Sequence, residues 1–249
     1  MVELQRPSRW SSPLTWLVVC VGVFAIVALI ANSLQEPRSH SPSWRAGCKN
    51  NLVAIGTALH QYHDEYGSFP PAYIADETGK PTHSWRVLLL PFLDMEPLYK
   101  EYRFDEPWDG PNNIKLLDQY PEVFWCLHEF EQNGTLRTTS YVAVVGDETI
   151  WPNRQSTRLD DIVSKDGSTF TIMVVELADS TILWTEPRDL MFDDLRFNFD
   201  KGREISSQHT GGAHVVFVDG RVSYISDEIA PSTLRALLTI DGGETINEF

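Results

Sequence analysis

The sequence predicts an α+β fold with an N-terminal transmembrane helix, an amphipathic helix packed on an antiparallel β-sheet, and a short C-terminal helix. Three observations lead to this prediction. An uncharged apolar segment lies near the N-terminus, apolar residues recur at helical spacing soon after it, and runs rich in β-branched and aromatic residues follow from about residue 137. Strands that cluster after helices are typical of an α+β fold with an antiparallel sheet.

Composition and charge limit the classes of function. The chain has 249 residues, of which 42% are hydrophobic and 22% are charged, and this balance is typical of a globular protein. The formal net charge at pH 7 is −15. Because an acidic surface repels phosphate backbones, we expect no nucleic-acid partner.

The first apolar segment predicts a single membrane span. Leu14 to Leu34 contains no charged residue, no proline and one glycine, and about 20 apolar residues suffice for a helix to cross a bilayer core. We therefore expect a cytoplasmic tail at 1–12, a transmembrane anchor at 13–34 and a linker at 35–43. A cleaved signal peptide is the alternative, although this apolar run is longer than usual for one. The anchored layout predicts a single-pass inner-membrane protein whose domain faces the periplasm.

Residues 44–249 are predicted to form the extracytoplasmic domain, which begins with a long helix. Its apolar positions are spaced four and three residues apart in turn, and this spacing places them on one face of a helix. They are Cys48, Leu52, Ile55, Leu59, Tyr62 and Tyr66. Gly67 is suited to follow the last helical residue, and Pro70 and Pro71 close the segment. The pattern therefore predicts a helix over 44–66.

Short helices and then strands are predicted in the rest of the domain. A helix is expected to begin near Ser84 and to break at Pro91, with further helical turns at 97–102 and 111–117. Runs rich in β-branched and aromatic residues predict strands within 139–146, 168–178 and 180–187. A last helix is expected to begin near Pro231.

The stretch HTGGAHVVFVDGRVSYI, from His209 to Ile225, raises the question of a metal site. His214 and Asp219 are five residues apart, and an extended strand places them roughly 16 Å from each other. Ligands of one zinc ion lie only about 2 Å from it. We therefore predict no metal site and no cofactor in this stretch. It is better interpreted as a β-hairpin with a two-residue type I′ turn at Asp219-Gly220.

The two-residue turn also predicts the register of the hairpin. Val216 is expected to pair with Ser223, and His214 with Ile225. Pleat alternation then places the core-facing side chains on one side of the sheet. They are Ala213, Val215, Phe217, Val222 and Tyr224.

Three residues before the hairpin complete this motif. Gly211 and Gly212 permit a sharp bend or a positive φ at the start of the strand. The hairpin does not explain His209, which we interpret as a buried structural residue that braces the two glycines.

Two cysteines lie in the predicted domain. Cys48 occupies the apolar face of the first helix, and Cys126 follows the apolar run VFW. In an oxidising compartment the two thiols can form a disulfide. Two buried free thiols are the alternative, and the sequence is compatible with both.

No catalytic residue is predicted. The paired carboxylates Asp160-Asp161 and Asp193-Asp194 are interpreted as solvated loop residues, because glycosidase chemistry needs two acids at a set distance across a cleft. His128 lies close to Cys126 in the sequence, but no third group is evident to orient it. The chain has no nucleophile elbow, phosphate-binding loop or zinc-binding helix motif.

Three stretches together resemble the domain of unknown function 1559 family of planctomycete bacteria. The first is CKNNLVAIGTALHQYHDEYGSFPPAYI, and the second contains HSWRVLLLPFLD and FDEPWDGPNN. The third is the H-x9-D-G spacing from His209 to Asp219-Gly220. The resemblance extends over about 44–243.

The resemblance implies a pilin-like layout and a membrane-anchored, non-enzymatic structural or interaction protein. A protein partner or self-association is then expected. Prepilin processing is not implied, because Val27 stands where such a site has a glutamate five residues after Gly22.

The resemblance also implies a relation to extracellular solute-binding proteins. The alternative function is therefore a tethered solute- or glycan-binding module. Exposed aromatic platforms would support this alternative, and the candidates are Trp108, Trp125, Trp151 and Trp184.

Overall fold

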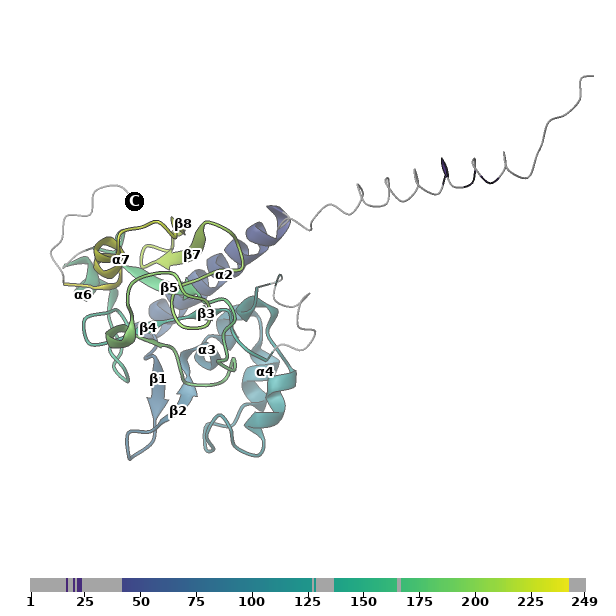
Figure 1. Cartoon of the computed structure of the whole chain (residues 1–249). Helices are drawn as coiled ribbons and strands as arrows, with labels where there is room; N and C mark the ends of the chain where they lie inside the picture. The colour runs from purple at the N-terminus through teal and green to yellow at the C-terminus, as the bar shows by residue number, and fades with distance from the viewer. Residues whose placement is uncertain are drawn as a thin grey trace, which may run out of the picture. The chain divides into compact units, whose positions relative to one another are not determined.

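The structure is a computed structural model that describes residues 42–126, 128, 137–164 and 167–241, together with Leu17, Cys20, Gly22 and Val23. The chain divides into two compact units, 1–41 and 42–249. The elements below belong to the second unit (Figure 1).

The prediction of a transmembrane helix is corrected. Within the described part of the chain, no helix is both long enough and apolar enough to cross a membrane. Helix α2 (Pro42–Tyr66) has the length, at 25 residues, but it carries charged side chains such as Arg45, Lys49 and Asp64. Most of the predicted anchor at 13–34 lies outside the described residues.

Helix α2 packs on the main sheet through the predicted apolar face. Cys48, Leu52, Ile55 and Leu59 are fully buried. A Cβ added at Gly56 would lie only 3.0 Å from a methyl group of Val216, so a small residue is needed where the helix meets the sheet. Gly67, at a φ of 75°, follows the last helical residue, and the predicted helix over 44–66 is confirmed to within two residues.

The main sheet has four antiparallel strands in the order β3-β5-β7-β8. They are β3 (Tyr141–Val142), β5 (Ile172–Glu176), β7 (Gly212–Phe217) and β8 (Val222–Ser226). The α+β class with an antiparallel sheet is therefore confirmed.

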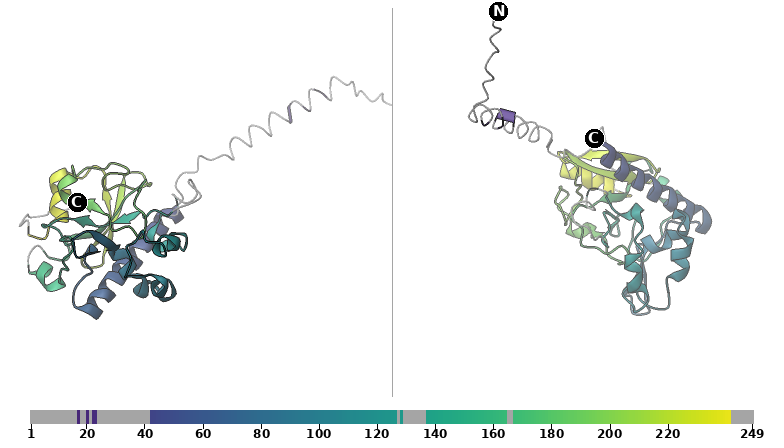
Figure 2. Two further views of the ribbon diagram at one scale, coloured as in Figure 1. Left: turned by 90° about the horizontal axis from the view of Figure 1, so that it is seen from below. Right: turned by 90° about the vertical axis from the view of Figure 1, so that its right-hand side faces the viewer.

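Strand β7 is buried on both faces of this sheet. Val216 and Val218 belong to the hydrophobic cluster that contains the buried face of α2. Ala213, Val215 and Phe217 belong to a second cluster, with Leu234 and Leu237 of helix α7 (Pro231–Leu238). Figures 1 and 2 show α2 and α7 beside β7, and the alternation of these side chains places the two helices on opposite faces.

The β7–β8 hairpin has a different register from the predicted one. Val216 pairs with Val222, and the Phe217 N–H donates to the Arg221 carbonyl at 2.9 Å. The Gly220 N–H donates back to the Phe217 carbonyl, also at 2.9 Å. This is a three-residue loop, a type I turn followed by a left-handed glycine, because Gly220 has a φ of 82° and the preceding aspartate does not have a positive φ. The predicted two-residue type I′ turn is wrong.

The change of register by one residue moves β8 side chains between faces. Val222 and Tyr224 now pair with Val216 and His214, on the α2 side, instead of sharing a face with Phe217. The prediction assumed one polar face, whereas both faces of β7 are covered.

Short helical segments lie between the longer elements along the chain. They are α3 (Trp85–Leu88), η1 (Leu90–Leu93), α4 (Glu96–Glu101), η2 (Asn113–Asp118), η3 (Glu122–Phe124), α6 (Leu159–Val163) and η4 (Phe192–Asp194). Ser84 caps α3 by accepting the Arg86 N–H at 3.3 Å, and Pro91 lies in the separate 3₁₀ segment η1. The predicted start and break are confirmed.

Two small sheets were not predicted. Strands β1 (Tyr73–Ala75) and β2 (Pro81–Ser84) form an antiparallel hairpin. Strands β4 (Val144–Val145) and β6 (Leu190–Met191) pair in parallel. The strand predicted over 180–187 is wrong, because that stretch contains only an isolated bridge and turns back through a hydrogen bond from the Glu186 N–H to the Leu183 carbonyl.

Gly212 allows a test of how β7 begins. Its φ is 148°, and an added Cβ would lie 1.9 Å from the Ile225 carbonyl oxygen of the paired strand. We expect Gly212→Ala to lower the free energy of unfolding by roughly 3–5 kcal/mol, from backbone strain and a clash. Gly211→Ala is the matched control, since its φ is 88° but no atom lies within 4 Å of the added Cβ; we expect a loss of about 1–2 kcal/mol. Urea unfolding measures both, and equal losses would contradict the assignment.

Candidate functional site

Arg86 and Asp189 form an ion pair deep inside the domain. Nη2 of Arg86 lies 2.5 Å from Oδ1 of Asp189, and the two side chains are 0% and 2% exposed. Arg86 comes from α3, whereas Asp189 directly precedes β6. A buried charge of this kind is tolerated only when it is paired and fully hydrogen-bonded.

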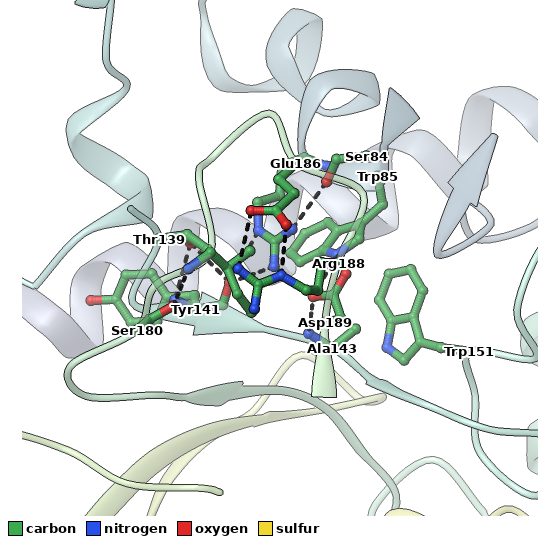
Figure 3. Close-up of polar contacts among 12 residues, drawn as sticks. Ser84, Trp85, Thr139, Tyr141, Ala143, Trp151, Ser180, Glu186, Arg188 and Asp189 are labelled. Carbon is green, nitrogen blue, oxygen red and sulfur yellow. Dashed lines mark hydrogen bonds and ion pairs between the residues drawn. The ribbon is translucent and has the colours of Figure 1, made fainter. Parts of the chain in front are cut away.

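The remaining polar atoms of this pair are satisfied. Arg86 donates to the Tyr141 carbonyl through Nε at 3.2 Å and through Nη2 at 3.1 Å, and to the Ser84 hydroxyl through Nη1 at 3.0 Å. Asp189 accepts from Trp85 Nε1 at 3.2 Å and from the Ala143 N–H at 2.8 Å. Figure 3 shows Asp189 between Trp85 and Ala143. The pair therefore joins α3, the β3–β4 segment and β6.

Opposing effects act on the protonation of the pair. Burial raises the pKa of Asp189 and lowers the pKa of Arg86, because each charged form loses its hydration. The partner charge and the hydrogen bonds act against burial in both cases. Every hydrogen-bond partner of Asp189 is a donor, and this environment matches a carboxylate rather than a carboxylic acid. We therefore assign the pair as ionised, with a structural role.

A cavity of about 640 Å³ lies beside Asp189. Its walls combine apolar side chains such as Ile182 and Leu190 with the charged side chains of Arg188, Asp194 and Arg203. Nε of Arg188 is held at 2.6 Å from a carboxylate oxygen of Glu186, a contact drawn in Figure 3. A cavity of this size can hold a small organic molecule.

A disulfide between Cys48 and Cys126 defines a second buried cluster. The two Cα atoms are 5.4 Å apart, and 78 residues separate the cysteines in sequence. The bond fastens α2 to the segment that follows η3. Closing a loop of this length stabilises the fold by about 4.5 kcal/mol in the chain-entropy account.

His209 lies against this disulfide. Its side chain is buried, and Nε2 is 3.9 Å from Sγ of Cys126. Its ring also lies beside the rings of His128 and His214, with centroids 6.4 and 6.2 Å away. Burial lowers the pKa of His209 to about 4, so the imidazole is neutral at pH 7. His209 therefore contacts the cystine, an association that strand reasoning did not reveal.

Glu176 completes the polar part of the second cluster. Its Oε2 accepts the backbone N–H of His214 at 2.7 Å and lies 3.3 Å from Nδ1 of the same residue. Both side chains are at most 5% exposed. Sequence reasoning missed Glu176, Arg86 and Asp189. The available signal for the first two was a single charged residue inside an apolar run, which indicates a buried and paired group.

A family model described as a protein of unknown function (DUF1559) matches residues 44–143 and 194–232. The chain belongs to the DUF1559 family. The resemblance noted in the sequence is thereby confirmed. No curated protein and no solved structure matches the chain.

The DUF1559 match covers part of each cluster, and Arg86 of the first cluster lies within a matched segment. Cys48, Cys126 and His209 all fall within the matched segments, whereas Asp189 and Glu176 fall between them. The contact between the cystine and the first histidine of the H-x9-D-G motif is therefore built from positions that the family model covers.

The structure separates the other motif residues from this cluster. Asp219 lies in the hairpin turn, where Oδ1 accepts the Arg221 N–H at 2.9 Å. Gly220 follows it in the left-handed conformation. Gly211 precedes β7 and Gly212 is its first residue, and both have a positive φ. These residues shape the two ends of the strand.

Breaking the Arg86–Asp189 pair tests its structural role. We expect Arg86→Met to lower the free energy of unfolding by about 3–5 kcal/mol, because it leaves a buried carboxylate without its counter-charge. The additional change Asp189→Leu should recover part of that loss. Arg137 pairs with Asp118 at an exposed site, and Arg137→Met is the matched control, with an expected loss below about 1 kcal/mol. Equal losses in urea unfolding at the two sites would refute the assignment.

The lowered pKa of His209 predicts a pH dependence of stability. In the unfolded chain the imidazole binds a proton near pH 6.5, and in the folded protein only near pH 4. Between these values the unfolded state carries more protons, so stability rises with pH and is lost as the pH falls through this window. The shift corresponds to at most about 3.4 kcal/mol.

Unfolding of the oxidised protein at a series of pH values measures this slope. His209→Gln should flatten the curve between pH 4 and 6.5, because glutamine does not titrate there. An NMR signal from His209 that titrates near pH 6.5 in the folded protein would contradict the interpretation.

Proposed function

We propose that this protein is an extracytoplasmic structural or interaction protein of pilin-like build, without catalytic activity. The observation that carries this proposal is the packing of a 25-residue helix across a four-stranded antiparallel sheet. A long helix laid on such a sheet is the layout that the family resemblance implies for pilins. Fold alone does not establish function, so the polar sites must support the proposal as well.

The disulfide supports a location outside the cytoplasm. Cys48 and Cys126 are bonded and buried. Disulfides persist in oxidising compartments such as the bacterial periplasm, whereas the cytosol keeps thiols reduced. A bond that fastens α2 to the body of the domain also suits a protein that bears mechanical load.

The buried polar groups support a non-catalytic role. Asp189 is engaged by Arg86 and by further donors, and Oε2 of Glu176 accepts the His214 N–H. Groups that are held in this way cannot readily exchange protons with a substrate. Each of them instead joins segments that are distant in sequence.

A solute-binding module is the second candidate. Exposed tryptophans would favour it, but Trp151 and Trp184 are at most 1% exposed and Trp125 is 6% exposed. A stacking platform for sugars therefore lacks three of its four candidate residues. The cavity beside Asp189 remains in favour of a small solute.

Photo-crosslinking in living cells tests the proposal. A photoreactive amino acid at Val53 or Tyr66, which are exposed apolar residues of α2, should give products that contain a second copy of the chain or another protein. The same group at Val163 on α6, also exposed, is the positional control and should react less. A strictly monomeric protein with no crosslinked partner at any position would contradict the proposal and favour the solute-binding alternative.

A further inference from the structure

We propose that the reduced protein binds a zinc ion through Sγ of Cys48, Sγ of Cys126 and Nε2 of His209. These three ligand atoms lie within 4.8 Å of one another, and all three residues are buried. Two thiolates and an imidazole form a ligand set that favours zinc over hard cations such as magnesium or calcium.

The spacing of the atoms is close to that of a metal site. Zinc lies about 2.3 Å from a thiolate sulfur and about 2.0 Å from an imidazole nitrogen, so two ligands of one tetrahedral ion are roughly 3.5–3.8 Å apart. The Cys126 sulfur and the His209 nitrogen are already 3.9 Å apart. Once the disulfide is reduced, the two sulfurs need only separate to a similar distance.

Three distant segments hold the ligands in place. Cys48 is fully buried on α2. The backbone N–H of Cys126 donates to the Ser140 hydroxyl at 2.9 Å, and that of His209 donates to the Ser207 hydroxyl at 3.1 Å. The fold, and not a local sequence motif, brings these residues together, so no sequence pattern predicts the site.

A fourth ligand has two sources. The buried ring of His128 lies 6.4 Å from the ring of His209, between centroids, and a shift of its side chain could complete a tetrahedral site. Water is the other source, as in zinc sites with three protein ligands.

The disulfide and the metal ion define two exclusive states. A dithiol reductant transfers two electrons and two protons to the Cys48–Cys126 bond, giving two thiols while the reductant becomes a disulfide. Zinc then displaces the two thiol protons without any change of oxidation state. In the reverse step a second disulfide accepts two electrons from the two thiolates and takes up two protons to become a dithiol, so that the Cys48–Cys126 bond forms again and the zinc ion is released.

A metal titration of the full chain tests this proposal. Cys20 is first replaced by serine, because it is the other cysteine of the chain and would complicate the stoichiometry. The protein is reduced with a trialkylphosphine and titrated with Co²⁺ as a spectroscopic substitute for zinc. We expect thiolate-to-cobalt charge-transfer bands that saturate at one equivalent, and that disappear when Zn²⁺ is added. The oxidised protein is the control and should show no bands.

Variants then identify the ligands. His209→Ala should weaken binding by at least roughly 100-fold, since loss of even a supporting residue can cost that much. His63→Ala changes a half-buried histidine elsewhere on α2 and should leave the affinity unchanged. Cys126→Ser should abolish the bands, with circular dichroism as the check on folding.

Three outcomes would overturn the proposal. The first is the absence of charge-transfer bands in the reduced Cys20→Ser protein. The second is an unchanged affinity in a folded His209→Ala variant. The third is equal binding in urea, which would show that the unfolded chain binds the ion. Protection of both thiols from alkylation by zinc needs no ligand variant and decides the matter if Cys126→Ser fails to fold.

Discussion

The buried Arg86–Asp189 ion pair is the constraint on which the packing of α3, the β3–β4 segment and β6 depends. Its hydrogen bonds reach the carbonyl of Tyr141 and the N–H of Ala143, on either side of Val142 in the β3–β4 segment. Arg86 donates to the Tyr141 carbonyl, and Asp189 accepts the Ala143 N–H. In a regular β-sheet a neighbouring strand would form these backbone hydrogen bonds. The two charged side chains form hydrogen bonds with the backbone where the chain leaves the four-stranded sheet at β3 and enters the two-stranded sheet at β4.

The same argument explains why polar residues recur inside this domain. Short strands and 3₁₀ segments satisfy few backbone groups by themselves, and buried groups without partners are costly. Side chains supply the missing bonds, as when Trp151 Nε1 donates to the Met173 carbonyl at 2.6 Å. Thr139 likewise donates to the Phe124 carbonyl at 3.0 Å. Buried polar residues therefore need not indicate catalysis in this fold.

The sequence predicted elements with a strong period and missed those that depend on distant partners. Helix α2 was predicted because apolar residues recur at helical spacing from Cys48 to Tyr66. The hairpin was found from Asp219-Gly220, but its register was wrong because the same dipeptide serves both a type I′ turn and a type I turn with a left-handed glycine. Only Gly220 adopts the positive φ. The packing on both faces of β7 decides between the two turn types, and the local sequence does not reveal this packing.

The candidate sites show the same limit. His209 could be identified as unexplained, but its partner Cys126 is 83 residues away, and no periodicity links them. Asp189 stands in a loop of ordinary polarity and acquires its role only when Arg86 is folded against it. Interactions between single residues far apart leave no repeating pattern in a sequence.

The H-x9-D-G spacing corresponds to the length of strand β7 between His209 and the hairpin turn. His209 lies against the cystine before β7 begins, and Asp219-Gly220 turns the chain after it ends. Between them lies a strand of six residues, which spans roughly 20 Å. An inserted residue would either move the histidine away from the disulfide or shift β7 against its neighbours, and a shift by one would exchange its two buried faces. The spacing therefore links the disulfide that fastens α2 to the register of the central strand β7. This link accounts for the fixed separation of the histidine and the turn, although the two take part in no common reaction.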